Sequence, residues 1–157
     1  MFNLIVLLVM LFGPAQCFKD YLKNSAVLGE VARGYKEGDL SQLRPLLKAV
    51  TGREPAAYNN YGCHCGQRGG QNIPAVDGVD RCCKEHDECY ANLPECQNRE
   101  VEYFYQCQAN KKCRCISFLR SCNGKVCKCD LELANCLSRE FYDYYYVNFQ
   151  KKYCKKF

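Results

Sequence analysis

DRCCKEHDECY occupies Asp80–Tyr90 and sets the architecture of this chain. Two of its cysteines, Cys82 and Cys89, are seven residues apart. Further along the chain, Cys129 and Cys136 repeat that spacing. Because seven residues make about two turns of α-helix, each pair lies on one stripe of its own helix. The spacing therefore predicts two helices that face each other through their cysteines.

The residue numbers favour an antiparallel arrangement of these helices, of which the first is expected over Asp80–Ala91. The pairs Cys82–Cys136 and Cys89–Cys129 have the same sum of residue numbers, as disulfides between antiparallel neighbours require. Spacing alone leaves other disulfide connectivities open.

A histidine and an aspartate lie beside these cysteines. His86 comes four residues after the first cysteine of its helix and three before the second, so it shares their face. Asp130 adjoins Cys129, and its carboxylate can reach the same gap. A histidine held opposite a carboxylate is an oriented general base. Asp87 points about 100° away from His86, toward whatever packs beside the helix start.

The glycine-rich stretch Gly62–Gly78 leads into the first of these helices and reads as a loop. A carboxylate such as Asp87 beside the carbonyls of such a loop suits a hard, oxygen-seeking cation, usually Ca²⁺. Zinc would compete if the cysteines were free, but an oxidising compartment favours disulfides. His64 and His86 are the only histidines, which excludes a multi-histidine metal site.

An amphipathic helix is expected over Asp39–Val50, ahead of this loop. Asp39 can cap its start, and Thr51-Gly52 ends it. Pro45 is expected near the start, where the first turn absorbs it. Apolar residues recur at helical spacing, at Leu40, Leu43, Leu46, Leu47 and Val50.

Two more elements follow the first cysteine-bearing helix. Glu100–Cys115 contains an alternating stretch that suits a β-hairpin. Cys115–Tyr142 reads as the second long helix, broken near Asn123-Gly124. The aromatic and basic tail that follows is expected to serve core and interfacial packing.

The N-terminus and the cysteine content indicate secretion. Met1–Gln16 has the pattern of a secretory signal peptide, and its apolar run over Leu4–Phe12 is too short to span a bilayer. The chain has 15 cysteines, the density of a disulfide scaffold. If residues 1–17 are the signal peptide, Cys17 leaves with it and an even number of cysteines remains. Cleavage after Ala15 would instead leave Cys17 as an odd thiol.

Residues 18–38 contain no cysteine and separate the signal peptide from the body. They are either a pro-segment, with Arg33 or Lys36 as a processing cue, or an ordinary N-terminal extension. Residues 39–157 are expected to form one domain, because 48% of the 157 residues are hydrophobic and no linker interrupts them. The net charge of +5 favours anionic surfaces. No base-reading motif is present, so a nucleic-acid partner is not expected.

YGCHCG over Tyr61–Gly66, the DRCCKEHDECY stretch and CKCDLELANC over Cys127–Cys136 together resemble the secreted phospholipase A2 family. The resemblance covers Asp39–Cys154 and is specific, because DxCCxxHDxCY fixes cysteine, histidine and aspartate together. It implies a mainly α, disulfide-rich fold: an N-terminal helix, a calcium loop, two long antiparallel disulfide-linked helices and a short β-wing hairpin. It also implies calcium-dependent hydrolysis of the sn-2 ester of phosphoglycerides at membrane surfaces.

The same resemblance assigns roles to the site residues. His86 would be the general base that activates water, and Asp130 would orient and stabilise its imidazolium. Tyr90 and Tyr103 would hydrogen-bond Asp130. The acyl-chain channel would be lined by Leu40, Leu43 and Leu47.

The implied calcium ligands are the Asp87 carboxylate and the backbone carbonyls of His64, Gly66 and Gly69. The Gly66 N–H would help to stabilise the oxyanion. The loop is longer than is usual for the family, by about two residues, so Arg68 could supply the third carbonyl in place of Gly69.

The resemblance also implies a set of disulfides. It leaves Cys107 and Cys113 to face each other across a hairpin turned by Ala109–Lys111. The full set is Cys63–Cys154, Cys65–Cys83, Cys82–Cys136, Cys89–Cys129, Cys96–Cys122, Cys115–Cys127 and Cys107–Cys113.

Two rival functions use the same scaffold. One is an otoconin-like binding or mineral-matrix protein, and the other is a toxin-like protein that acts by binding a membrane or a channel. Relatives of the first kind tend to lose the catalytic residues, whereas this chain retains His86, Asp87, Asp130, Tyr90 and Tyr103. We therefore expect a secreted, monomeric enzyme with a phospholipid membrane surface as its partner.

Overall fold

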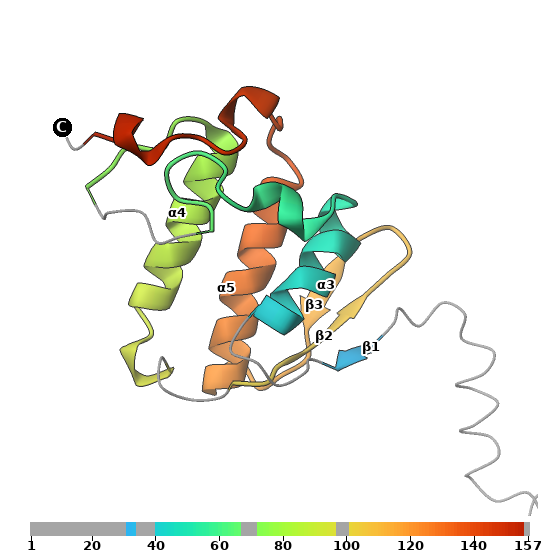
Figure 1. The fold of residues 1–157 in the computed structure, drawn as a ribbon. Helices are drawn as coiled ribbons and strands as arrows, with labels where there is room; N and C mark the ends of the chain where they lie inside the picture. Colours follow the sequence, from blue (N-terminus) through green and yellow to red (C-terminus); the bar gives the residue numbers. More distant parts are fainter. Residues whose placement is uncertain (1–30, 34–39, 67–71, 97–100, 156–157) are drawn as a thin grey trace, which may run out of the picture.

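The structure, a computed structural model, describes residues 31–33, 40–66, 72–96 and 101–155. In these residues it has three α-helices, short 3₁₀ turns and a small antiparallel sheet (Figure 1). The predicted mainly α-helical, disulfide-rich fold is confirmed. No helix in the described ranges is long and apolar enough to cross a bilayer. The expected signal peptide over 1–17 and the Asp39 cap lie outside these ranges.

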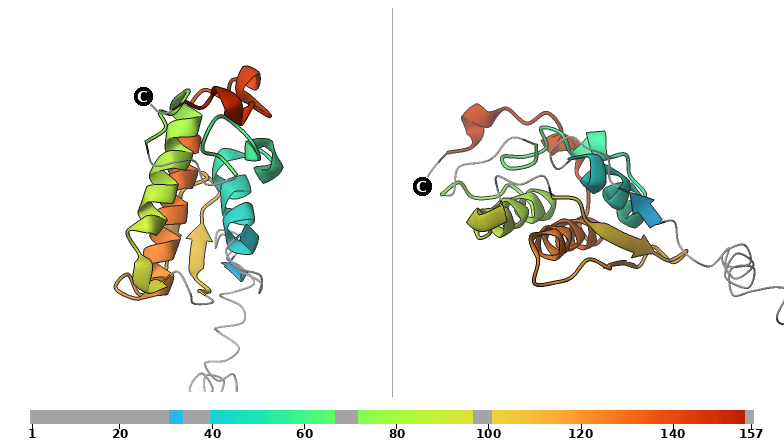
Figure 2. Two further views of the ribbon diagram at one scale, coloured as in Figure 1. Left: turned by 60° about the vertical axis from the view of Figure 1, so that its left-hand side comes forward. Right: turned by 90° about the horizontal axis from the view of Figure 1, so that it is seen from below.

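α4 (Gly78–Ala91) and α5 (Cys122–Leu137) form the centre of the fold. They lie side by side and run in opposite directions (Figure 2). The disulfides Cys82–Cys136 and Cys89–Cys129 join them, each with its Cα atoms 5.8 Å apart. The facing sides of the two helices are therefore held at a fixed separation.

α5 is shorter than the sequence predicts, because residues 115–121 are not helical. Ser121 caps the helix, since its Oγ accepts from the Gly124 N–H at 3.3 Å. A Cβ on Gly124 would lie 2.2 Å from the carbonyl oxygen of Phe118, so glycine lets the preceding loop fold against the first turn. The expected break at Gly124 is thus the start of the helix. At the other end, α5 stops at Leu137, five residues earlier than predicted.

α3 (Leu40–Thr51) packs across α5 (Figure 1). Pro45 is the sixth residue of this helix and not near its start, which corrects the prediction. Its side chain is exposed, so water can hydrogen-bond to the carbonyl one turn earlier, which receives no N–H from the proline. The opposite face is buried, at Leu43, Leu46, Leu47 and Val50.

The sheet has the strand order β1-β2-β3, formed by Val31–Arg33, Phe104–Cys107 and Cys113–Cys115. β2 and β3 are the expected hairpin, and Cys107 faces its disulfide partner Cys113 directly across it. β1 was not expected. It comes from the cysteine-free segment 18–38 and pairs antiparallel with β2. The expected pro-segment role of residues 18–38 stays a prediction.

The C-terminal tail folds back over the start of the glycine-rich loop, along the top of the molecule in Figure 1. Cys154 in the tail is bonded to Cys63 in the loop. Tyr142 is buried and packs on Tyr61 with ring centroids 4.9 Å apart, whereas Tyr144 and Tyr145 are exposed. The tail therefore contributes partly to the core and partly to the surface.

Candidate active site

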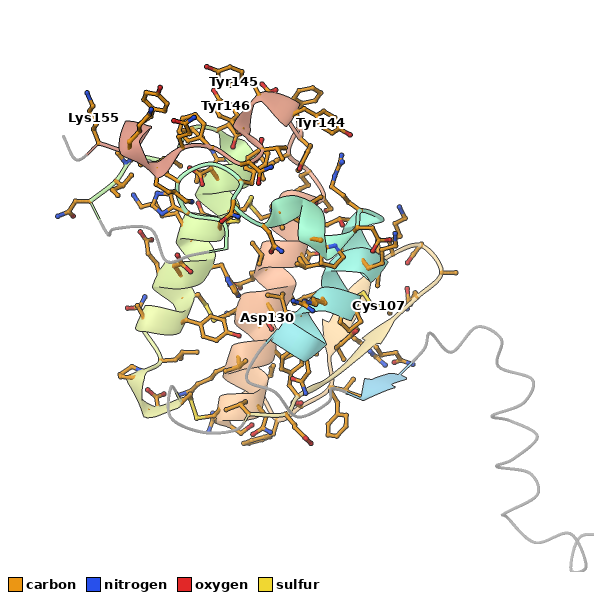
Figure 3. The ribbon with its side chains drawn as sticks, viewed as in Figure 1. Cys107, Asp130, Tyr144, Tyr145, Tyr146 and Lys155 are labelled. Carbon is orange, nitrogen blue, oxygen red and sulfur yellow. A yellow bond between two sulfur atoms is a disulfide. The ribbon has the colours of Figure 1, made fainter. Side chains whose placement is uncertain are left out.

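His86 of α4 faces Asp130 of α5 across the gap between the two disulfide-linked helices. Its Nε2 lies 2.8 Å from Asp130 Oδ1. A carboxylate oxygen can only accept, so Nε2 carries the hydrogen and Nδ1 is left as the basic nitrogen. His86 is 15% exposed, whereas Asp130 is fully buried near the centre of the molecule (Figure 3). The pair therefore joins a buried anion to a histidine that reaches the surface of a cavity.

Two tyrosines complete the hydrogen bonding of Asp130. The Tyr90 hydroxyl donates to Oδ1 at 2.8 Å, and the Tyr103 hydroxyl donates to Oδ2 at 2.5 Å. Burial, together with the negative charge of Asp130, raises the pKa of Tyr103 well above its ordinary range, so this phenol stays a donor. Gln42 of α3 accepts from the Tyr103 N–H at 3.1 Å and holds its backbone in place. A buried carboxylate needs this degree of pairing to remain charged.

His86 opens onto a cavity of about 220 Å³ between α3, α4 and the glycine-rich loop. Leu43 and Leu47 of α3 line one side, as the resemblance implied for an acyl-chain channel. The side chain of Leu40 lies outside the described part of the chain. The cavity therefore combines apolar walls with one polar end, which suits an amphipathic ligand.

The polar end of this cavity contains three of the four expected calcium ligands. His64, Gly66 and Asp87 all line it, while Gly69 and its alternative Arg68 lie outside the described residues. Gly66 adopts φ +95°, a conformation that favours glycine, and a Cβ there would lie 3.0 Å from the Asn60 nitrogen. One carboxylate and backbone carbonyls would form an all-oxygen donor set. This chemistry fits Ca²⁺.

The Phospholipase A2 family matches residues 40–147. The chain belongs to the phospholipase A2 family. Group 10 secretory phospholipase A2 of Rattus norvegicus is 35% identical over 155 residues, which cover 98% of this chain and 95% of the rat protein. Phospholipase A2 of Ovis aries is 39% identical over 125 residues, covering 73% of this chain and 99% of the sheep protein. Basic phospholipase A2 homolog textilotoxin B chain of Pseudonaja textilis is 43% identical over 89 residues, covering 55% of this chain and 72% of the textilotoxin chain.

The seven disulfides among the described residues of this phospholipase A2 family member join the pairs that the resemblance implied. Two of them hold the glycine-rich loop to its neighbours, Cys63–Cys154 to the tail and Cys65–Cys83 to α4. The other five are Cys82–Cys136, Cys89–Cys129, Cys96–Cys122, Cys107–Cys113 and Cys115–Cys127.

Asp80 supports the glycine-rich loop, a role that sequence reasoning missed. It is fully buried, and it accepts from the His64 N–H at 2.7 Å and from the Val76 N–H at 3.0 Å. One carboxylate thus ties together the two ends of the loop, which are twelve residues apart in the sequence. Its position at the head of the DRCC motif was the only signal.

Sequence reasoning also found no role for the side chain of His64, because the resemblance assigns a function only to its backbone carbonyl. The ring is buried, and its Nε2 lies 3.1 Å from the Ile73 carbonyl oxygen. The His64 side chain therefore connects the start of the glycine-rich loop to its later part at Ile73. Nothing in the residue pattern indicates such a contact.

Proposed function

We propose that this chain is a secreted, calcium-dependent phospholipase A2 that hydrolyses the sn-2 ester of phosphoglycerides. The products would be a lysophospholipid and a free fatty acid. The observation that carries the proposal is the His86–Asp130 pair, held by Tyr90 and Tyr103 and opening onto a partly apolar cavity. Family membership supports it, because phospholipases A2 act on phospholipids at membrane surfaces.

His86 is the general base in this proposal. Its Nδ1 takes a proton from a water molecule as the water oxygen attacks the ester carbon. The same proton then passes to the departing glycerol oxygen as the ester bond breaks, so His86 ends neutral and ready for another cycle. A neutral imidazole suits this task at physiological pH.

Asp130 orients the ring of His86 and stabilises the imidazolium that forms transiently. Its hydrogen bond to Nε2 keeps the hydrogen on that nitrogen and the basic lone pair on Nδ1. Tyr90 and Tyr103 hold the carboxylate and compensate for its burial. The two tyrosines therefore act on the reaction through Asp130.

Asp87 and the carbonyls of His64 and Gly66 would hold Ca²⁺, with Gly69 or Arg68 as a further carbonyl. When bound, the ion would polarise the ester carbonyl and offset the charge that develops on its oxygen. The Gly66 N–H would donate to that oxygen as well. Leu43 and Leu47, with Leu40, would receive the acyl chain and exclude water from it.

In this proposal, residues 1–17 are a signal peptide that directs secretion. Residues 18–38 are a removable pro-segment, and residues 39–157 are the enzyme. The seven disulfides among the described residues support folding in an oxidising compartment. N-terminal sequencing of the protein recovered from culture medium tests both cleavage sites.

The decisive experiment measures fatty-acid release from phospholipid vesicles with Ca²⁺ and with a chelator. Calcium-dependent release of sn-2 acyl chains supports the enzyme. Folded protein that binds Ca²⁺ and releases no fatty acid would instead favour a binding module on the same scaffold. The name of the textilotoxin B chain, a phospholipase A2 homolog, keeps that alternative worth testing.

A further inference from the structure

The C-terminal tail forms two hydrogen bonds with one residue at the base of the glycine-rich loop, Gly62. The Gly62 N–H donates to the Tyr146 carbonyl at 2.9 Å, and the Gly62 carbonyl accepts from Lys151 Nζ at 3.0 Å. The next residue in the chain is Cys63, which is bonded to Cys154 of the tail. The ammonium group of Lys151 is therefore held at Gly62, two residues before His64 in the sequence.

The ammonium group of Lys151 shares this region with two carboxylates. Burial lowers the pKa of Lys151 below its usual value, and the negative charges of Asp80 and Asp87 oppose that shift. Asp80 packs under Gly62, since a Cβ on Gly62 would come within 2.4 Å of the Asp80 carboxyl carbon. Both Asp80 oxygens accept backbone N–H groups, whereas Asp87 lines the cavity. The Gly62 contact thus holds a positive charge two residues from His64, which lines the same cavity as Asp87.

We propose that Lys151 is a positioning residue whose fixed positive charge weakens calcium binding at Asp87 and so sets the Ca²⁺ concentration that the protein requires. This inference rests on the calcium site of the proposed function. Two cations held close to one carboxylate repel each other, and because Lys151 is an exposed residue, water and salt screen part of that repulsion. A weakened site suits an extracellular protein, because calcium modules outside cells bind in the range of roughly 10⁻⁴ to 10⁻³ M.

Lys152 offers a matched control on the same short turn, Lys151–Tyr153. Like Lys151 it is an exposed residue, but its Nζ lies 5.0 Å from the Tyr153 ring centroid and not on the loop. Neutralising Lys152 removes the same charge from the same turn and leaves the Gly62 contact intact. The pair therefore separates a local effect of Lys151 from a general effect of net charge.

The test is isothermal titration calorimetry of Ca²⁺ binding to the purified protein, without lipid, at low and at high salt. Lys151→Gln keeps an N–H donor, Lys151→Met keeps the length of the side chain, and both remove the charge. Each is expected to bind Ca²⁺ about threefold to tenfold more tightly than wild type at low salt. The gain should shrink at high salt. Lys151→Arg should stay near wild type, and Lys152→Gln should gain much less.

A purely structural role for Lys151 predicts the opposite sign, because a loosened loop would bind calcium more weakly. Either neutral variant binding Ca²⁺ no more tightly than wild type overturns the proposal. So does an equal gain in Lys152→Gln. Because the titration needs no substrate, a chain that binds Ca²⁺ but hydrolyses nothing would refute the enzyme and leave this inference standing. A wild-type chain that binds no Ca²⁺ overturns both.

Discussion

Tyr103 donates its hydroxyl hydrogen to Oδ2 of Asp130 at 2.5 Å, and this bond is buried. It brings the residue just ahead of β2 into contact with the middle of α5. The catalytic aspartate in our proposal is therefore held by the sheet side of the molecule as well as by α4.

Removal of this hydroxyl should cost stability more than activity. Tyr103→Phe leaves a buried carboxylate oxygen without its donor, so we expect a loss of about 1 to 3 kcal/mol in the free energy of unfolding. Hydrolysis should fall by less than about tenfold, since Tyr90 and His86 still contact Asp130. Urea unfolding and vesicle assays measure the two effects. Tyr142→Phe is the control, because its hydroxyl donates to the Ala57 carbonyl away from the site.

The same tyrosine should make stability depend on alkaline pH. Burial and the charge of Asp130 raise the pKa of Tyr103 above the usual value of 10.0, so the unfolded chain releases this proton at lower pH than the folded chain does. The stabilisation is complete below about pH 10 and is lost as the pH rises through the folded pKa. Above about pH 10, the unfolding free energy of Tyr103→Phe should therefore fall less steeply with pH than that of wild type. Equal slopes for the two proteins would contradict this assignment.

Replacement of the general base should separate catalysis from binding. His86→Asn is expected to lower kcat by about 10² to 10⁴-fold, the usual contribution of a positioned base. Its Ca²⁺ affinity and vesicle binding should remain close to wild type, because His86 is not among the expected ligands. Full hydrolytic activity in this variant would exclude the proposed mechanism.

Calcium should control activity without controlling the fold. Asp87→Asn removes the charged ligand while conserving its shape, and we expect Ca²⁺ affinity to fall by at least about tenfold. A chelator should abolish hydrolysis by wild type and leave its far-ultraviolet circular dichroism unchanged. Disulfides, rather than the ion, hold the loop to α4 and to the tail. Restoration of activity by added Ca²⁺ completes the test.

Two disulfides should differ in their contribution to stability. Cys107–Cys113 closes a separation of 6 residues, whereas Cys63–Cys154 closes one of 91. Chain entropy predicts losses of about 2 and about 4.6 kcal/mol for the paired serine variants. Only the second variant should also weaken Ca²⁺ binding, because of these two bonds only Cys63–Cys154 holds the glycine-rich loop. Denaturant unfolding and calorimetry report the two quantities.

The sequence by itself determined the features that depend on local spacing. The seven-residue separation of Cys82 and Cys89 placed both on one helix face, and His86 between them had to share that face. The leucine pattern of residues 40–50 likewise determined α3 and its buried side. Helical periodicity is a property of neighbouring residues, so it can be read without knowledge of the fold.

Tertiary structure alone decided the features that join distant segments. Residues 115–121 left the helical pattern because β3 pairs with β2 and Ser121 caps α5. The Asp80 carboxylate holds both ends of the loop, and Lys151 reaches Gly62 across a separation of 89 residues. No periodicity records such contacts, because they arise from the way in which packed helices and disulfides bring remote backbone groups within hydrogen-bonding distance.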